Sequence, residues 1–498
     1  ESSWAAAYPD IRGFAGFNRH PIFEGFAGGL YTWAPGVGDH YSAAYYEDVT
    51  PLSGTIVAVE KLYIRLNELR RNIVEHRHGK GGVLSIGAHF YFSNQKQRYR
   101  PHLEKFTLGC LDYLQMRHTQ PSERRRSEKD PGEPYWHVGV PTVTEFMHTS
   151  KALGVIDCRL SKASGDLALH RDFASPDRHE QFFDLSGRRI LIMGKERSGI
   201  AEVWCHPVRV LEDLKVGFKV GDAQPRWSQE LSPVITITPE SLTRRFDIDG
   251  CVIEETTFAD STRPCGALHY RVRTKERVQI IVTARVDLRL MWPVSEHATG
   301  PLRYAWDDGI RAGIVTDRKG GVASVLGSSV RPTEWIIGQY SEVVIEDDHL
   351  IGHRTSRPVA AIGLRVTLTP KSKHCTFAVA GSDQSLREAV HSYHSIMRHP
   401  ASSLRGQVRR FRALERNSTR VVTPDEQFNK AYRWSLVGLE KMFVETPRLG
   451  RSFVAGYGLS TSGWHGDHSI SGRPGYAWYF GRDSVWTSMA VLDYGDHG

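Results

Sequence analysis

Several features are missing from this sequence, and each absence excludes a class of protein. No run of about 20 apolar residues occurs in the 498 residues, so no membrane-spanning helix is predicted. Cysteine is scarce: the six cysteines are dispersed, with no C-x-x-C pair and no Cys/His cluster at zinc spacing. Structural zinc is therefore not predicted, and the cysteines are interpreted as small buried apolar side chains.

Nucleotide-binding glycine motifs are absent too. No G-x-G-x-x-G follows a strand-like run, and there is no Walker loop. The glycine-containing stretches GKGG (79–82) and RKGG (318–321) lack the strand-to-helix context that a phosphate loop requires. The sequence predicts no organic cofactor.

The net charge of +8 does not form a nucleic-acid surface. Much of it is local: 121–133 mixes three arginines with acidic residues, and 405–416 has the pattern of a solvated helix face. No basic stripe interleaved with aromatic residues follows any predicted element, so nucleic acid is not an expected partner.

The remaining composition is typical of a soluble globular protein, with 40% hydrophobic and 24% charged residues. At roughly 100–200 residues per domain, the length predicts about three domains. The chain begins at Glu1, without an initiator Met or a secretory signal, so we expect a processed protein or a fragment. A cytoplasmic location is slightly favoured, and the oligomeric state stays open.

Residues 1–170 alternate strand-like and helix-like runs. The glycine-bounded apolar run 81–93 predicts a buried strand, and 100–118 has apolar residues near helical spacing. A short strand and a helix from about Val143 are predicted next. This order favours an α/β region with a parallel sheet.

Residues 171–381 read as almost entirely β. More than ten short runs, many of them alternating apolar and polar residues, are separated by Gly, Pro, Asp or Ser, and DIDG (247–250) predicts a tight turn between two of them. We expect a large antiparallel β-sandwich. The strand candidates are 188–194, 200–211, 235–238, 241–248, 251–259, 267–274, 278–292, 359–370 and 374–381.

The last part is helical, with linker helices over 382–425 and the start of an all-α domain over 426–498. A helix within 381–400 is predicted to be capped by Ser382 or Asp383 and closed by Pro400. A helix over 423–445 is predicted to open at Thr423, with Pro424 in the first position. Two further helices are predicted over 404–415 and 483–495.

The segment RPGYAWYFGRDSVW (473–486) crowds aromatic residues around one Arg–Asp pair. Sugars offer C–H faces that stack on aromatic rings and hydroxyls that accept or donate charge-assisted hydrogen bonds. Tyr476 and Trp478 would wall a sugar pocket, Arg482 and Asp483 would hold its hydroxyls, and Gly475 and Gly481 would let the backbone approach the ligand. The alternative interpretation is an aromatic loop on a helical core with a structural ion pair.

YAWYFGRDSVW, preceded by a helix and TPRLGRSFVAGYG (446–458), resembles the entry to an (α/α)6-barrel glycosidase domain. The similarity is greatest to the amylo-α-1,6-glucosidase, or glycogen-debranching, group and to glucoamylase-like enzymes, in which a large sandwich precedes the barrel. The resemblance implies an inverting hydrolase in which Trp478 stacks on the terminal sugar while Arg482 and Asp483 bind its outer hydroxyls.

An inverting mechanism needs a general acid and a general base roughly 6.5–9.5 Å apart. Only about four helices are predicted after 381, so we expect both carboxylates to lie beyond this chain. Glu440, Glu445 and Asp493 are interpreted as solvated or structural acids.

GGVLSIGAHFYFSN (81–94), followed by a helix and YWHVGVPTVTEFMHTSKA (135–152), resembles the C-terminal half of NodB-like polysaccharide deacetylases. The resemblance implies that His89 is a general acid. His20, His40, His76 and His78 lack the H-x-x-x-H spacing of that family's metal site, so no metal is predicted. The alternatives are a polysaccharide deacetylase-like protein, a non-catalytic carbohydrate-binding protein, and another carbohydrate-acting enzyme on the same scaffold, such as a trehalase-like or rhamnosidase-like hydrolase or a phosphorylase.

Overall fold

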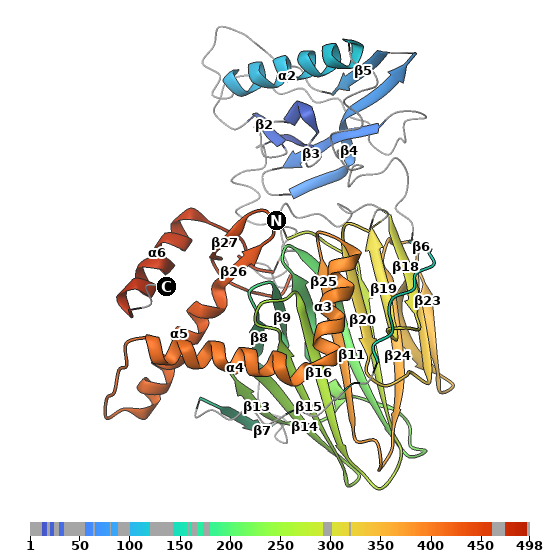
Figure 1. Cartoon of the computed structure of the whole chain (residues 1–498), viewed down its shortest axis with the longest axis vertical. Helices are drawn as coiled ribbons and strands as arrows, with labels where there is room; N and C mark the ends of the chain where they lie inside the picture. Colours follow the sequence, from blue (N-terminus) through green and yellow to red (C-terminus); the bar gives the residue numbers. More distant parts are fainter. Residues whose placement is uncertain are drawn as a thin grey trace. The chain divides into compact units, whose positions relative to one another are not determined.

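A computed structural model describes residues 12–16, 20–23, 29–33, 55–62, 65–79, 81–87, 100–119, 143–154, 156, 160, 167–172, 180–291, 301–317, 320–460 and 474–495 (Figure 1). These residues belong to two compact units. The described residues from 12 to 119 lie in the first unit, and those from 143 to 495 lie in the second.

The first unit contains one five-stranded sheet in the order β2-β1-β3-β4-β5. Every strand pair in it is antiparallel, so the predicted parallel sheet is wrong. Only two residues separate β3 from β4 and β4 from β5, and parallel neighbours need much longer crossovers. The strands are β1 (Arg12–Gly16), β2 (Gly29–Trp33), β3 (Thr55–Leu62), β4 (Arg65–His78) and β5 (Gly81–Ile86).

Helix α2 (Arg100–Thr119) confirms the helix predicted over 100–118. Its buried residues Leu103, Phe106 and Cys110 form one core with β3 and with the short 3-10 helix η1 (Pro21–Phe23). Spacing of three and four residues places these side chains on one face of the helix, and that face packs on the sheet.

The second unit is built on two large sheets. One has ten strands in the order β6-β18-β19-β20-β25-β16-β15-β14-β13-β7. They are β6 (Val143–Glu145), β7 (Leu169–Asp172), β13 (Val234–Thr238), β14 (Ser241–Ile248), β15 (Cys251–Ala259), β16 (Cys265–Arg273), β18 (Leu302–Asp307), β19 (Ala312–Asp317), β20 (Ala323–Ser328) and β25 (His374–Ser382).

The other sheet has eight strands, seven in the order β21-β24-β17-β11-β10-β9-β8 and β12 paired beside β11. They are β8 (Phe182–Ser186), β9 (Ile190–Lys195), β10 (Gly199–Cys205), β11 (Val208–Val220), β12 (Arg226–Trp227), β17 (Val278–Val286), β21 (Glu334–Gly338) and β24 (Ala360–Leu368). A separate hairpin of β22 (Tyr340–Glu346) and β23 (His349–Arg354) packs on β17 and β24 through one small apolar cluster.

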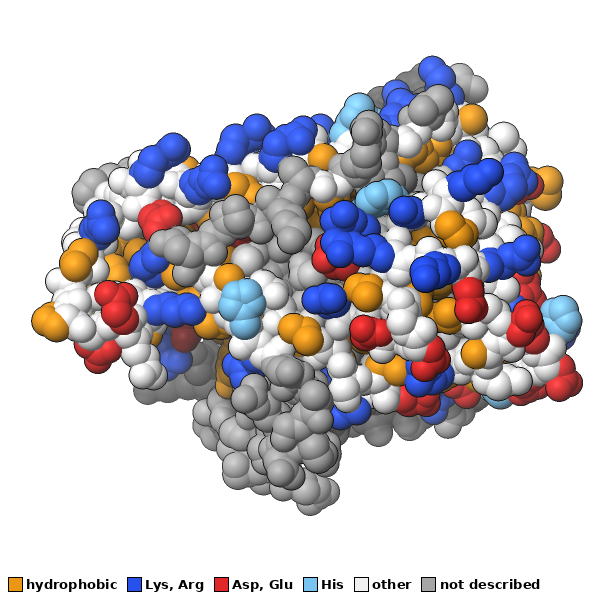
Figure 2. All heavy atoms as spheres, turned by 90° about the horizontal axis from the view of Figure 1, so that it is seen from below, with side chains coloured by type: hydrophobic (Ala, Val, Ile, Leu, Met, Phe, Trp, Pro, Cys, Tyr) orange, Lys and Arg blue, Asp and Glu red, His pale blue; other side chains and the backbone are white. Residues whose placement is uncertain are grey.

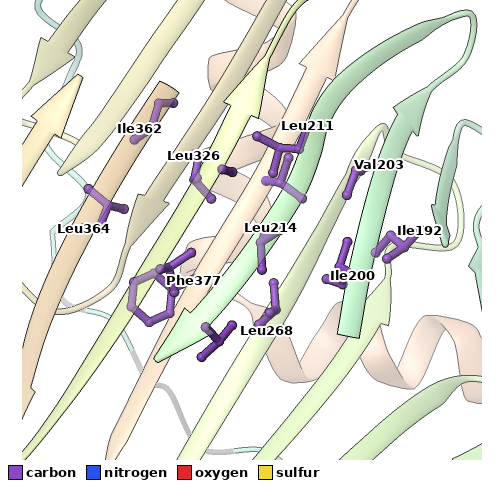
Figure 3. Packing of buried hydrophobic residues seen from close by; sticks show 14 of the residues in the cluster. Ile192, Ile200, Val203, Leu211, Leu214, Leu268, Leu326, Ile362, Leu364 and Phe377 are labelled. Carbon is purple, nitrogen blue, oxygen red and sulfur yellow. The ribbon is translucent and has the colours of Figure 1, made fainter. Parts of the chain in front are cut away.

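The two sheets share one hydrophobic core, which agrees with the sandwich predicted for this part of the chain. Ile192 and Ile362 of the eight-stranded sheet and Leu268, Leu326 and Phe377 of the ten-stranded sheet belong to that core (Figure 3). Within the described pairs of both sheets, only β6 runs parallel to its neighbour, β18.

The hairpin of β14 and β15 shows how the sequence pattern produces a strand pair. Leu242, Phe246 and Ile248 alternate with more exposed residues, so one face of β14 is buried. The predicted turn is confirmed: Asp249 and Gly250 both have positive φ, at 52° and 81°, between the paired residues Ile248 and Cys251. Such a two-residue turn matches the natural twist of a hairpin.

The sequence pattern singles out no strand between 293 and 358, yet β18 to β23 lie there. Strand β20 is ASVLGS, a run with small residues and weak strand preference. A side chain at Gly327 would meet the Tyr393 hydroxyl at 2.3 Å, so the small residue there follows from a helix packed on the sheet. That requirement is set by tertiary contact and leaves no local signal.

The helix predicted from about Val143 is wrong. Val143–Glu145 forms strand β6, and residues 146–154 are not helical. The Phe146 amide donates to the Tyr304 carbonyl at 2.9 Å, and the Arg303 guanidinium lies 4.4 Å from the Phe146 ring centroid. Pairing with β18 therefore overrides the local helical pattern.

Four helices are described after the sandwich: α3 (Leu386–Arg398), α4 (Pro400–Asn417), α5 (Glu426–Met442) and α6 (Gly481–Asp493). In Figure 1, α3 lies along β16, β20 and β25 of the ten-stranded sheet, and its buried residues join their core. The helix caps differ from the prediction: Ser385 caps α3 in place of Ser382 or Asp383, and Asp425 caps α5 in place of Thr423.

The structure adds detail to the predicted ends of two helices, at Pro400 and at the end of α5. Pro400 follows the end of α3, as expected, and is also the first residue of α4, where its missing amide proton costs nothing. The helix predicted to run to 445 ends at Met442, because 443–446 forms β26 (Phe443–Thr446) paired with β27 (Gly450–Phe453).

Cysteines and surface charge complete the description. The cysteines in the described ranges are all buried, as predicted: Cys110, Cys205, Cys251, Cys265 and Cys375. On the face shown in Figure 2, Lys and Arg side chains are interspersed with acidic and uncharged ones. None of the helices that the structure describes combines the length and the apolar character needed to cross a lipid bilayer.

Candidate functional site

Residues 474–480 form a segment with a turn at 475–476, which contacts the hairpin of β26 and β27 and leads into α6. The Ala455 amide donates to the Trp478 carbonyl at 3.2 Å, and the Ser484 hydroxyl donates to the Phe453 carbonyl at 2.7 Å. The Tyr457 hydroxyl donates to the Lys441 carbonyl at 2.7 Å, which ties the chain after β27 to the end of α5. Hydrogen bonds on both sides of the aromatic segment therefore fix its path along the hairpin.

The aromatic residues of the segment divide into two pairs. Tyr476 meets Phe480 edge to face at 6.1 Å between ring centroids, and Trp478 lies tilted against Tyr479 at 5.6 Å. The Tyr479 hydroxyl donates to Thr446 Oγ1 at 2.7 Å, and burial raises the pKa of this phenol. Tyr479 is thus an anchor, whereas Tyr476 is 40% exposed and so can contact a ligand.

Arg482 and Asp483 occupy the first turn of α6. One guanidinium nitrogen of Arg482 lies 3.4 Å from the Asp483 carboxylate, and the two side chains are 81% and 35% exposed. A carboxylate at the N-terminus of a helix is favoured by the helix dipole. An ion pair this exposed contributes little to stability, so both groups are available to hydroxyls from solvent.

Gly475 and Gly481 differ in whether the protein's own packing requires a glycine at that position. Gly475 has φ of +62°, and a Cβ there would lie 2.7 Å from the Gly458 amide nitrogen, so this glycine is required by chain packing. At Gly481 a Cβ would meet nothing within 4 Å. Only Gly481 is therefore consistent with a role in ligand approach.

A buried network that no sequence pattern indicated holds the chain just after β27. Ser460 Oγ donates to Glu202 Oε1 at 2.5 Å, and Arg209 Nη1 donates to Ser460 Oγ at 3.0 Å. Arg209 also pairs with Asp287 and Glu212, at 2.5 and 2.9 Å. Burial alone would lower the pKa of the Arg209 guanidinium. The carboxylates around it outweigh burial, so the pKa of Arg209 is raised above its ordinary value. Because Ser460 is about 250 residues from its partners, no local pattern predicts this network.

The acids near the segment have structural partners. Glu440 is paired with both Arg188 and Arg410 at 2.6 Å, and Glu445 is paired with Arg451 at 2.6 Å. Asp493 is an exposed residue at the end of α6. The interpretation of Glu440 and Glu445 as structural acids agrees with these contacts.

Two predicted features lie outside the described residues. His89 is one, and the glycine- and serine-rich stretch 461–473 before the aromatic segment is the other. In the described ranges, no group of three or more His, Cys, Asp or Glu side chains could hold a metal ion. The aromatic rings and the Arg482–Asp483 pair can therefore bind a polar ligand through ring contacts and hydrogen bonds.

No protein-family model matches this sequence, and no curated protein matches it either. Among solved structures, the chain is similar to a bacterial glucoamylase complexed with acarbose, with 11% identity over 66% of this chain and 51% of that one and a TM-score of 0.44. It is also similar to a GH92 inverting mannosidase from Bacteroides thetaiotaomicron, with 12% identity over 56% of this chain and 38% of that one and a TM-score of 0.32. The chain spans about half the length of the glucoamylase.

Proposed function

We propose that this chain is part of a glycoside hydrolase that acts on the ends of α-glucosidic oligo- or polysaccharides. In this proposal the enzyme is of the inverting, debranching amylo-α-1,6-glucosidase type, and the helices after residue 426 begin an (α/α)6 barrel. Residues 476–483 form the subsite for the terminal sugar. Trp478 stacks on the ring, and Arg482 and Asp483 bind its outer hydroxyls.

The observation that carries the proposal is the exposed Arg482–Asp483 pair in the first turn of α6, directly after an aromatic segment. A guanidinium and a carboxylate side by side supply donors and acceptors for two neighbouring hydroxyls. An aromatic wall adds apolar contact with the C–H face of the sugar.

The proposal assigns sugar binding to these residues and assigns no general acid or base. Glu440 is held between two arginines, and Glu445 is paired with Arg451. Because each carboxylate is committed to an arginine, neither is chosen as a proton donor or acceptor in the reaction.

Isothermal titration calorimetry with maltose, isomaltose, trehalose and cellobiose tests the subsite. We expect one α-glucoside to bind, and Asp483→Ala to weaken that binding roughly 10- to 100-fold, because charge-assisted hydrogen bonds to hydroxyls are lost. Asp493→Ala is the matched control, since it removes another exposed carboxylate from the same helix and should leave binding unchanged.

Equal binding by wild type and Asp483→Ala would remove the sugar-binding role from this turn. Binding of cellobiose alone would contradict the α-glucosidic assignment. Gly481→Ala adds a steric test, because a methyl group there meets nothing in the protein. It should therefore weaken binding only if the ligand itself lies close to this backbone.

A further inference from the structure

Two tryptophans from opposite sheets stack on each other in the sandwich. Trp306 lies on β18 of the ten-stranded sheet, and Trp335 lies on β21, which is at the edge of the eight-stranded sheet. Their ring centroids are 4.5 Å apart, and the ring planes differ by only 10°. The rings are therefore nearly parallel.

Trp335 remains 43% exposed despite this stacking. Since Trp306 covers one face of its indole, the exposed area must come from the opposite face and the ring edges. Among the residues that the structure describes, none accepts a hydrogen bond from the Trp335 indole N–H. A large, flat apolar ring with an unused donor is therefore exposed at this point of the surface, next to a second indole, and it offers a ligand both apolar contact and a hydrogen bond.

A charged pair lies at the rim of the two rings. Asp308 Oδ1 accepts a hydrogen bond from Trp306 Nε1 at 3.1 Å and lies 3.6 Å from Arg331 Nη1. The side chains of Asp308 and Arg331 are 72% and 71% exposed. Because the pair is so exposed, it adds little to stability, and its remaining donors and acceptors face solvent.

We propose that Trp306, Trp335, Asp308 and Arg331 form a second carbohydrate-binding site, the tryptophan platform, which takes one pyranose unit of a polysaccharide. The open face of Trp335 contacts the C–H face of the sugar ring. Asp308 accepts from one hydroxyl of that sugar, and Arg331 donates to another. The rim carries one carboxylate and one guanidinium, so it offers the hydroxyls of an uncharged sugar both an acceptor and a donor.

The ligand class follows from the residues of the platform and does not depend on the segment 476–483. The platform is made by β18, β21 and the residues next to them, whereas the proposed subsite belongs to α6 and the segment 474–480 that precedes it. A platform of this kind would hold a polymer on the sandwich while its end is bound elsewhere. Two sites on one chain raise the apparent affinity for a polymer above that for a short sugar.

Affinity electrophoresis in native gels tests the platform, with soluble starch, dextran or a mannan cast into the gel. We expect retardation by one of these polymers, and Trp335→Ala should raise the apparent dissociation constant about tenfold or more, as truncation of a central aromatic anchor does. Asp308→Ala should weaken retardation less. Phe182→Ala is the matched control, because Phe182 is 42% exposed on the same sandwich and should have no effect.

Asp483→Ala run in the same gels separates this proposal from the proposed function. Loss of retardation in Trp335→Ala with Asp483→Ala unaffected supports the platform even if the subsite fails. Unchanged retardation in Trp335→Ala, with an unchanged melting temperature, would overturn the platform, and so would the absence of retardation of wild type by all three polymers. Analytical ultracentrifugation adds a further check: a monomer–dimer equilibrium lost in Trp335→Ala, without a change in polymer binding, would assign the rings to self-association.

Discussion

A buried arginine shows how one residue constrains the fold. Arg244 points into the core between the two sheets and is 1% exposed. Its Nε and Nη2 donate to both oxygens of Glu255 at 2.8 and 2.9 Å, and the Tyr270 hydroxyl donates to the same carboxylate at 2.7 Å. The pair is tolerated because each charge is neutralised and hydrogen-bonded by the other.

Removing one partner of this pair should therefore be costly. We expect Glu255→Gln to lower the free energy of unfolding by about 3 kcal/mol, since the Arg244 charge would remain buried without its counterion. Urea titration followed by tryptophan fluorescence measures the change. Glu254→Gln is the control, because the neighbouring side chain faces the other side of β15 and should change stability by less than about 0.5 kcal/mol. Equal losses in the two variants would contradict the account.

The start of α5 illustrates the scale of one element. Asp425 Oδ1 accepts hydrogen bonds from the Gln427 and Phe428 amides at 2.9 and 3.0 Å. Thr423, which the sequence pattern favoured as the cap, instead bonds the Asp425 amide and the Asn429 side chain. Both residues are good capping types, and only the path of the preceding chain decides which carboxylate or hydroxyl reaches the open amides.

Two substitutions at Asp425 separate the contribution of its capping hydrogen bonds from the contribution of its negative charge. Asp425→Ala should lower the free energy of unfolding by about 1 kcal/mol, because two amides lose their acceptor. Asp425→Asn keeps a side-chain acceptor and should retain most of the stability. Thermal melting followed by circular dichroism gives both values. Similar losses in the two variants would point to the negative charge near the helix N-terminus as the main contribution.

At the scale of the whole molecule, buried histidines couple stability to pH. Burial lowers the pKa of His206 and of His269 from the ordinary 6.5 to about 3, with Arg189 and His374 adding to the effect. In the unfolded chain both imidazoles take up protons once the pH falls below about 6.5. The folded state resists protonation until about pH 3, so stability is full above 6.5 and declines between these values.

This linkage predicts the effect of removing one imidazole. Between pH 7.5 and 5.0, the loss of unfolding free energy should be smaller in His269→Gln than in wild type by about 1–2 kcal/mol. Urea titrations at the two pH values measure it. His170→Gln is the control, because His170 is an exposed imidazole that, like His269, bonds a threonine hydroxyl. A loss in His269→Gln equal to that of wild type would show that this imidazole is not the source of the acid sensitivity.

Much of the fold follows from local pattern. Strands β14 and β15 occupy the predicted ranges 241–248 and 251–259, and the turn between them is where DIDG placed it. Helices α2, α4 and α6 were also predicted within a few residues. The aromatic segment and its Arg–Asp pair stood out in the sequence because the residue types are adjacent along the chain.

The sequence by itself determined many of the strands and helices, such as β14, β15 and α2, since the alternation of apolar residues and the conformations allowed to Gly, Asp and Pro act over a few residues. Only the tertiary structure decided which strands pair, as at β6 beside β18, and which distant groups meet, as Ser460 meets Glu202 and Trp306 meets Trp335. These contacts join residues separated by long stretches of chain. Their free energy depends on how the whole core packs, and no short window of sequence contains that information.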